Sequence, residues 1–217
     1  MRRRSILFSL AALLALGAAP PAGQQTQPIP GMVRVRLVTS EGNIVLALDT
    51  RRAPKTTANF LAYVDDGRLN DTLFYRAAKR TGAPRFGFIQ GGIGTDYRRM
   101  LPPVKLEPTS QTGIRHTDGV ISMARSANPD SGTGNFSLLI GPNPALDAKP
   151  GNPGYAAFGR IIAGMDVAKR ILAKPVGGGR GAMKGQMILA PVKILRAERL
   201  DGRPQPTRGP KPWLIGR

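Results

Sequence analysis

Glycine and proline are spread so densely along this chain that they limit how long any regular element can run. The 217 residues include 27 glycines and 20 prolines, together more than a fifth of the sequence. Both residues interrupt helices, and both are common in tight turns. A bundle of long helices is therefore excluded, and we expect short strands joined by many turns. Hydrophobic residues still make up 41% of the chain, which is enough to bury a core and excludes wholesale disorder.

Short runs of alternating apolar residues mark the expected strands. Residues 32–49 contain two such runs around the turn residues 40–43, which predicts a β-hairpin. Further strand-like runs lie at 72–76, 86–91, 119–125, 136–141, 155–162 and 191–199. Long loops are expected at 77–85, 93–118 and 142–154.

Two segments show the periodicity of amphipathic helices. The first begins at Pro54 and ends near Gly67, because proline suits the first helical turn and glycine suits a C-terminal cap. The second carries apolar residues from Met165 to Leu172 and is stopped by Pro175. Two helices are too few to connect about eight strands in parallel, so the sheet should be antiparallel. The prediction is a mostly-β fold, a closed eight-stranded antiparallel barrel capped by two α-helices.

The two ends of the chain differ in composition from its middle. Residues 1–23 combine three arginines, an apolar run and a stretch of small residues, which is typical of a secretory signal peptide; an uncleaved membrane anchor and a buried helix are the alternatives. A polar linker at 24–31 and a folded domain at 32–200 follow. Residues 201–217 form a basic tail rich in proline and glycine, expected to be mobile, with residues 213–215 (Trp213, Leu214 and Ile215) as a possible docking point. Export to a bacterial periplasm is the expected location.

Composition excludes several kinds of active site. The chain has no cysteine and one histidine, so thiolate nucleophiles, disulfides and multi-histidine metal centres are excluded. His116 lies in a polar stretch and is expected to be a turn residue, which leaves no Ser–His–Asp arrangement to build. The glycines at 177–179 lack the strand–turn–helix context of a phosphate loop. We therefore expect neither a metal nor a cofactor.

The chain is strongly basic, and its charge bears on which partners it can attract. Lysine and arginine number 32 against 13 acidic residues, for a formal net charge of +19. Aromatic residues are only 6% of the chain and form no stripe with the basic residues, so we expect no specific nucleic-acid interface. Weak, salt-sensitive attraction to anionic polymers of the cell envelope is the expected consequence.

One combination of segments is hard to explain as scaffold alone. Arg76 lies within an apolar strand pattern, and Gln90 ends another. The order of segments resembles the cyclophilin family of peptidyl-prolyl cis-trans isomerases over residues 33–200. The matching segments are 39–44, 53–60, 74–76, 88–92, 119–124, 146–147 and 158–167. Each match is weak evidence by itself, but their shared order along the chain is strong evidence for the resemblance. The capped barrel of the family also agrees with the fold expected from the strand pattern.

The resemblance implies a role for particular residues. Arg76 would be the catalytic donor to the nitrogen of an Xaa–Pro bond, and Gln90 would hold the substrate backbone. The further substrate-binding residues implied are Phe86, Phe88, Ala124, Arg125, Asn135, Phe136, Leu146 and Tyr155. Leu146 would receive the proline ring, and Tyr155 would bond a substrate carbonyl. The implied partners are proline-containing polypeptides, and a self-contained barrel is expected to be a monomer.

The chain departs from the family's usual pattern around the proline pocket. The spacing from Arg76 to Gln90 is longer than usual, so Phe86 is expected to take over a wall position. Ser137 and Ala145 stand where the family carries aromatic residues. Two hypotheses follow: an isomerase that assists the folding of exported proteins, and a cyclophilin-shaped peptide-binding or chaperone module with little catalytic rate. Retention of Arg76 and Gln90 favours the first, and Ser137, Gly87 and Ala145 favour the second.

Overall fold

The computed structural model describes residues 28–215 of the chain. The expected signal peptide at 1–23 and the first part of the expected linker lie outside the described residues. No helix in the described part is long and apolar enough to cross a membrane.

Nine strands and three α-helices make up the regular structure of the described part. The strands are β1 (Met32–Thr39), β2 (Gly42–Asp49), β3 (Thr72–Arg80), β4 (Ala83–Gly92), β5 (Val120–Met123), β6 (Asn135–Ile140), β7 (Ala157–Ala163), β8 (Val176–Gly177) and β9 (Met187–Arg199). The helices are α1 (Pro54–Asp65), α2 (Thr109–Thr112) and α3 (Met165–Ala173). Short 3-10 helices are η2 (Tyr97–Arg99), η3 (Pro144–Leu146), η4 (Gly181–Met183) and η5 (Pro212–Leu214).

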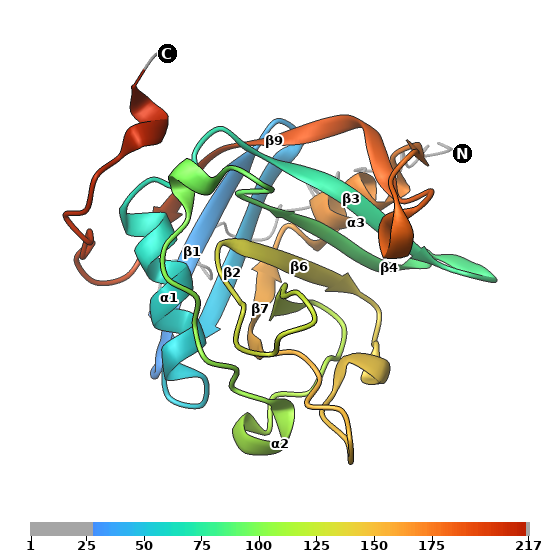
Figure 1. Ribbon diagram of the computed structural model, residues 1–217, viewed down its shortest axis with the longest axis horizontal. Coiled ribbons are helices and arrows are strands. Elements are labelled where there is room, and N and C mark those ends of the chain that lie inside the picture. Colours follow the sequence, from blue (N-terminus) through green and yellow to red (C-terminus); the bar gives the residue numbers. More distant parts are fainter. Residues whose placement is uncertain (1–27, 216–217) are drawn as a thin grey trace, which may run out of the picture.

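Eight of these strands close into an antiparallel barrel. Their order is β1-β2-β7-β5-β6-β4-β3-β9, and β9 pairs again with β1 to complete the ring (Figure 1). The two-residue β8 pairs only with the start of β9. The two longer helices, α1 and α3, lie on different sides of the barrel (Figure 1). The predicted closed eight-stranded antiparallel barrel is confirmed, and the single turn of α2 adds a third helix inside the long loop expected at 93–118.

Phenylalanine rings fill the interior of the barrel. Phe60 of α1 meets the ring of Phe136 edge-on, with centroids 5.2 Å apart, and lies 5.5 Å from Phe158. Phe74 also meets the ring of Phe136 edge-on, with centroids 5.8 Å apart. All four side chains are at most 1% exposed. Because these rings fill the interior of the eight-stranded barrel, a ligand has to bind on its outer surface.

The hairpin of β3 and β4 is longer than the sequence pattern suggested. The two strands extend through the loop expected at 77–85 and are connected by Thr81 and Gly82. The register shifts between the pairs Lys79–Gly87 and Arg80–Ala83, so residues 84–86 form a bulge in β4. Gly87 makes this possible: its φ is +147°, and an added Cβ would lie 2.0 Å from the carbonyl oxygen of Ala78. Only glycine fits so close an approach of two backbones. The expectation of a loop was wrong because glycine and proline mark turns in most sequences, whereas here they are built into a paired hairpin.

The basic C-terminal tail lies against the barrel. Asp201 forms a buried ion pair with Arg34, at 2.7 Å. Trp213 is 3% exposed, and the guanidinium carbons of Arg68 and Arg99 lie 4.4 and 5.8 Å from the centre of its ring. Stacking of this kind is most favourable when the cation is withdrawn from water. Of the three residues expected to dock, Trp213 does so, whereas Leu214 and Ile215 are 54% and 79% exposed. The contacts of Asp201 and Trp213 correct the expectation of a freely mobile tail.

Candidate active site

Four polar side chains form a row across neighbouring strands of the barrel. Arg76 of β3 is paired with Gln90 of β4, and Gln90 is paired with Ser137 of β6. Ser137 is in turn paired with Ser122 of β5. Side chains that are directly opposite one another lie on the same face of a sheet. The row therefore gathers residues from four separate parts of the sequence into one band of hydrogen-bonding groups.

A β-bulge turns Arg76 to the outer surface. Phe74 points into the core and is paired with Gly91, whereas Arg76 is paired with Gln90, so Tyr75 is an extra residue in the ladder. In a regular strand, residues two apart point to the same face, which would send Arg76 into the phenylalanine core. The extra residue reverses this alternation, as bulges beside functional sites often do.

The guanidinium of Arg76 is held by several hydrogen bonds. Its Nε and Nη2 donate to the Oε1 atom of Gln186, at 2.9 and 2.7 Å. Nη2 also donates to the carbonyl of Ala182 at 3.2 Å, and Nη1 donates to Oε1 of Gln90 at 2.9 Å. A guanidinium has five N–H groups, so these contacts with described residues leave one N–H, on Nη1, for a ligand.

The Arg76 guanidinium is also packed against an aromatic ring. Its central carbon lies 5.0 Å from the ring centre of Phe88. Burial lowers the pKa of Arg76 from its ordinary value. A guanidinium starts from so high a pKa that it stays protonated, and its charge is less screened away from water. The site therefore presents a fixed cation with one directed donor.

The row borders a cleft of about 430 Å³, which we call the Arg76 cleft. Its lining residues are Arg76, Phe88, Gln90, Ser122, Met123, Ala124, Arg125, Ser137, Leu146, Tyr155, Ala182 and Met183. Seven of the ten residues expected in the site are among them: Arg76, Gln90, Phe88, Ala124, Arg125, Leu146 and Tyr155. Apolar groups make up most of the lining, as in most small-molecule or side-chain pockets.

Arg125 and Tyr155 form one rigid wall of the Arg76 cleft. Nε and Nη2 of Arg125 donate to the carbonyl of Gly154, at 3.0 and 2.8 Å. The Arg125 guanidinium lies over the Tyr155 ring, with its carbon 4.5 Å from the ring centre. The hydrogen bonds fix the edge of the Arg125 guanidinium, and the Tyr155 ring covers its face. Arg125 is therefore a fixed part of the wall.

Three residues expected in the site lie elsewhere. Phe86 packs against Gly141, where an added Cβ would come within 2.6 Å of its ring, so Phe86 does not replace a missing wall of the cleft. Phe136 is 0% exposed and belongs to the barrel core. Asn135 lies beside the cleft: its side chain accepts from the backbone N–H of Gly94 at 2.8 Å and donates to the Gly94 carbonyl at 3.0 Å. The long hairpin carries Phe86 away from the position that spacing alone suggested.

His116 is more than the turn residue that the sequence suggested. Its ring is buried, with Nδ1 2.7 Å from Oδ1 of Asp147 and Nε2 2.8 Å from Oγ of Ser122. A carboxylate accepts the Nδ1 proton, so Nε2 accepts from the serine hydroxyl. A Ser–His–Asp arrangement therefore does exist, contrary to expectation. Ser122 is only 2% exposed, and Asp147 follows Leu146 directly in the chain, so the network links β5 to the segment that carries Leu146.

The segment between β8 and β9 supplies contacts that sequence reasoning missed. Ala182 and Met183 of η4 line the Arg76 cleft, and Gln186 holds its guanidinium. Their position follows from the pairing of β9 with β3, which sets Met187 opposite Arg76. No local pattern in this glycine-rich segment pointed to the site, because the contact depends on strands far apart in the sequence.

Comparison with known proteins bears on the family and the fold. The family model described as "Cyclophilin type peptidyl-prolyl cis-trans isomerase/CLD" matches residues 34–199. Peptidyl-prolyl cis-trans isomerase A of Dickeya dadantii is 38% identical over 170 residues, which are 77% of this chain and 84% of that protein. A peptidyl-prolyl cis-trans isomerase of Acinetobacter baylyi is 32% identical over 164 residues, covering 76% of this chain and 84% of that protein.

A solved structure supports the architecture independently. A cyclophilin-type peptidyl-prolyl cis-trans isomerase of Cryptosporidium parvum, determined in the presence of the dipeptide Ala-Pro, superimposes with a TM-score of 0.62. It is 22% identical in sequence, and the match covers 78% of this chain and 99% of that structure. At that identity the likeness concerns the fold.

Proposed function

This chain belongs to the cyclophilin-type peptidyl-prolyl cis-trans isomerases, and we propose that its Arg76 cleft accelerates rotation about Xaa–Pro bonds in exported polypeptides. The observation that carries the proposal is the Arg76 guanidinium, which keeps one N–H for a ligand beside an apolar cleft. The same cleft is the size of a single side chain and its neighbouring backbone.

The chemistry of this rotation needs no nucleophile. The barrier of ~18–20 kcal/mol arises because the C–N bond has partial double-bond character. When the bond is twisted, the lone pair of the proline nitrogen is no longer delocalised and becomes a hydrogen-bond acceptor. A donor directed at that nitrogen binds the twisted state more strongly than the planar ones, and this difference lowers the barrier. One preorganised donor contributes about 3 kcal/mol, or roughly a hundredfold in rate.

Each side of the cleft has a part in this proposal. The Nη1 donor of Arg76 serves the proline nitrogen, and Gln90 both orients that donor and offers its amide to the client backbone. Phe88 and Leu146 provide apolar contact for the proline ring. Tyr155, on the wall held by Arg125, is placed to bond a client carbonyl. No bond is broken, so none of these groups needs to transfer a proton.

The proposed clients are exported proteins, and the location is a bacterial periplasm. The support is the pattern of residues 1–23, in which arginines precede an apolar run. Proline isomerisation takes tens to hundreds of seconds without catalysis and can limit folding, so an isomerase is useful where secreted chains fold. The Cryptosporidium protein was crystallised in the presence of an Ala-Pro dipeptide, and we extend that ligand class to proline-containing segments here.

A peptide-binding module of low catalytic rate is the second candidate. Ser137 lines the cleft where the family resemblance implies an aromatic wall, and Ala145 is exposed beside the floor. Losing an aromatic wall weakens the hold on a proline ring, although it leaves the Arg76 donor in place.

A prolyl-isomerisation assay separates the two candidates. The protein, its Arg76→Ala variant and an Arg85→Ala control are compared on a short Ala-Pro peptide. Arg85 is exposed near the tip of the long hairpin and does not line the cleft. We expect kcat/KM to fall about a hundredfold in Arg76→Ala and to stay unchanged in Arg85→Ala. A well-folded parent protein that binds the peptide without accelerating its isomerisation would establish the binding module instead.

A further inference from the structure

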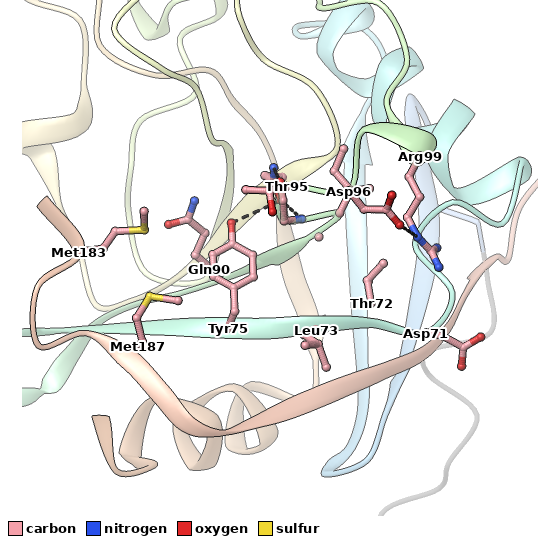
Figure 2. Close-up of a pocket in the computed structure, with 14 residues that line it drawn as sticks. Asp71, Thr72, Leu73, Tyr75, Gln90, Thr95, Asp96, Arg99, Met183 and Met187 are labelled. Carbon is pink, nitrogen blue, oxygen red and sulfur yellow. Dashed lines mark hydrogen bonds and ion pairs between the residues drawn. The ribbon is translucent and has the colours of Figure 1, made fainter. Parts of the chain in front are cut away.

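A second cleft lies next to the Arg76 cleft and is larger. It has a volume of about 550 Å³ and is formed by β3, the end of β4 and the loop that follows it, and the segment before β9 (Figure 2). We call it the side cleft. Its lining residues are Asp71, Thr72, Leu73, Tyr75, Gln90, Gly92, Ile93, Gly94, Thr95, Asp96, Arg99, Asn135, Met183 and Met187.

The side cleft and the Arg76 cleft share a border. Gln90 and Met183 line both of them, so a chain that crosses these two residues passes from one cleft into the other. Met183 is 39% exposed, and its unbranched side chain can adjust to what lies on either side. A polypeptide with its proline in the Arg76 cleft therefore has the side cleft within reach of a neighbouring residue, since each extended residue spans about 3.3–3.6 Å.

The side cleft is apolar at the end that adjoins the Arg76 cleft. Figure 2 shows Met183, Met187, Tyr75 and Gln90 at this end, while Asp71, Asp96 and Arg99 lie at the other. At the charged end, Asp96 is paired with Arg99 at 3.2 Å and with Arg98 at 2.9 Å. The part closest to the proline therefore suits an apolar side chain.

The wall around Tyr75 is ordered by hydrogen bonds. The Tyr75 hydroxyl donates to Oδ1 of Asn135 at 3.3 Å, and the same oxygen accepts from the backbone of Gly94 at 2.8 Å. Burial raises the pKa of Tyr75 to about 12, so the phenol stays neutral at physiological pH. The ring thus offers an uncharged, fixed surface, and Leu73, which is 36% exposed, adds an apolar side chain elsewhere in the lining of the side cleft.

We propose that the side cleft is a second binding site for the client, which receives a large apolar side chain flanking the proline. The proposal rests on the proposed function, because continuity with the Arg76 cleft identifies the occupant as the same polypeptide. It makes the enzyme selective for prolines that have a bulky apolar neighbour. Accessible prolines of this kind are common in unfolded chains, whose apolar residues are still exposed.

The test compares peptides that differ at one position. A parent peptide has a single Ala–Pro bond and alanine at every other position. Each of four variant peptides has one phenylalanine, placed at the first or second position before the Ala–Pro pair or at the first or second position after it. NMR exchange gives kcat/KM for each peptide with the unaltered protein. We expect phenylalanine at one or more of these positions to raise kcat/KM about tenfold over the all-alanine peptide.

Three protein variants locate the effect. Leu73→Ser removes apolar wall, and Thr95→Trp places a bulky ring on an exposed residue of the rim. Both should abolish the preference for phenylalanine while leaving kcat/KM for the all-alanine peptide unchanged. Leu195→Ser is the matched control, because Leu195 is an exposed leucine on β9 that lines neither cleft. It should keep the preference intact.

The outcomes distinguish this proposal from the one on which it rests. Acceleration of every peptide without any preference for phenylalanine would overturn the side cleft and leave the isomerase intact. A preference that survives both Leu73→Ser and Thr95→Trp would also overturn it. If no peptide is accelerated, the proposed function itself fails. A preference lost in both variants and kept in Leu195→Ser establishes the site.

Discussion

The two sides of the Arg76 cleft are built in different ways. On the polar side, Gln90, Gln186 and the Ala182 carbonyl together engage four of the five N–H groups of Arg76 among the described residues. On the apolar side, Phe88 and Leu146 remain, but Ser137 presents a small hydroxyl side chain to the cleft. Many hydrogen bonds thus fix the orientation of the charged donor, whereas few apolar side chains are available to bind the proline ring.

This difference separates the two quantities that describe an enzyme. A donor acting mainly on the twisted bond affects kcat, and apolar contact made equally with planar and twisted proline affects KM. We therefore expect an isomerase with a well-preserved kcat and a high KM. The predictions below test this division, beginning with the largest expected effect.

Replacement of Arg76 by lysine tests whether charge alone is sufficient on the polar side. We expect Arg76→Lys to lower kcat by about a hundredfold, because a single ammonium cannot keep the contacts of the planar fork and also direct a donor at the proline nitrogen. Steady-state kinetics on an Ala-Pro peptide measures it. A variant with near-normal kcat would show that the fixed orientation of the guanidinium contributes little.

Replacement of Gln186 tests the contact that fixes the guanidinium. Gln186→Leu keeps similar bulk but cannot accept the hydrogen bonds from Nε and Nη2 of Arg76. We expect kcat to fall about tenfold with little change in KM, since hydrogen bonds to charged groups contribute about 1.5–3 kcal/mol.

Gln186→Glu is the matched variant for this experiment. A carboxylate can accept from the same two nitrogens, so most of the kcat lost in Gln186→Leu should return. Equal losses in the leucine and glutamate variants would show that the acceptor at this position does not orient Arg76.

Restoring an aromatic side chain tests the apolar side. Ser137→Phe adds a ring to the wall between Gln90 and Ser122, and we expect KM to fall about fivefold while kcat stays the same. Ser137→Ala, which removes the hydroxyl without adding a ring, should leave KM unchanged. An unaltered KM in Ser137→Phe would mean that the proline ring does not lie against this wall.

A change of pH tests the buried support beneath the apolar side. Burial lowers the pKa of His116 from its ordinary 6.5, and Asp147 only partly opposes this. Below pH 6.5 the imidazole is protonated in the unfolded chain but still neutral in the folded chain. The free energy of unfolding should therefore fall as the pH drops below about 6.5, until the pH reaches the lower pKa of the folded state.

Urea unfolding between pH 7.5 and 5 measures this dependence. His116 is the only histidine in the sequence, so His116→Gln should flatten the curve across this window. Identical pH dependence in the parent and the variant would assign the loss to other groups. The lowered pKa values of Asp49, Asp66 and Asp201 act in a separate, more acidic range.

Much of the fold could be predicted because it depends on local pattern. The hairpin of β1 and β2 follows from alternating apolar residues around a glycine turn, and α1 follows from Pro54 and a helical stripe that the structure buries. Strand count and the shortage of long helices were sufficient to predict an antiparallel barrel. The expected loop at 77–85 was wrong because Gly82 and Pro84 mark only a two-residue turn and a bulge, while β3 and β4 extend on both sides of them.

By itself, the sequence determined the barrel class, the family resemblance and the pair of Arg76 and Gln90, since these depend on side-chain periodicity and on the order of short segments. Only the tertiary structure decided that Tyr75 is bulged so that Arg76 faces outward, that Gln186 holds the guanidinium, and that His116 joins Ser122 to Asp147. The physical reason is the same in each case. Hydrogen bonds and strand register between distant segments depend on how the whole barrel closes, and the local sequence around each residue does not specify them.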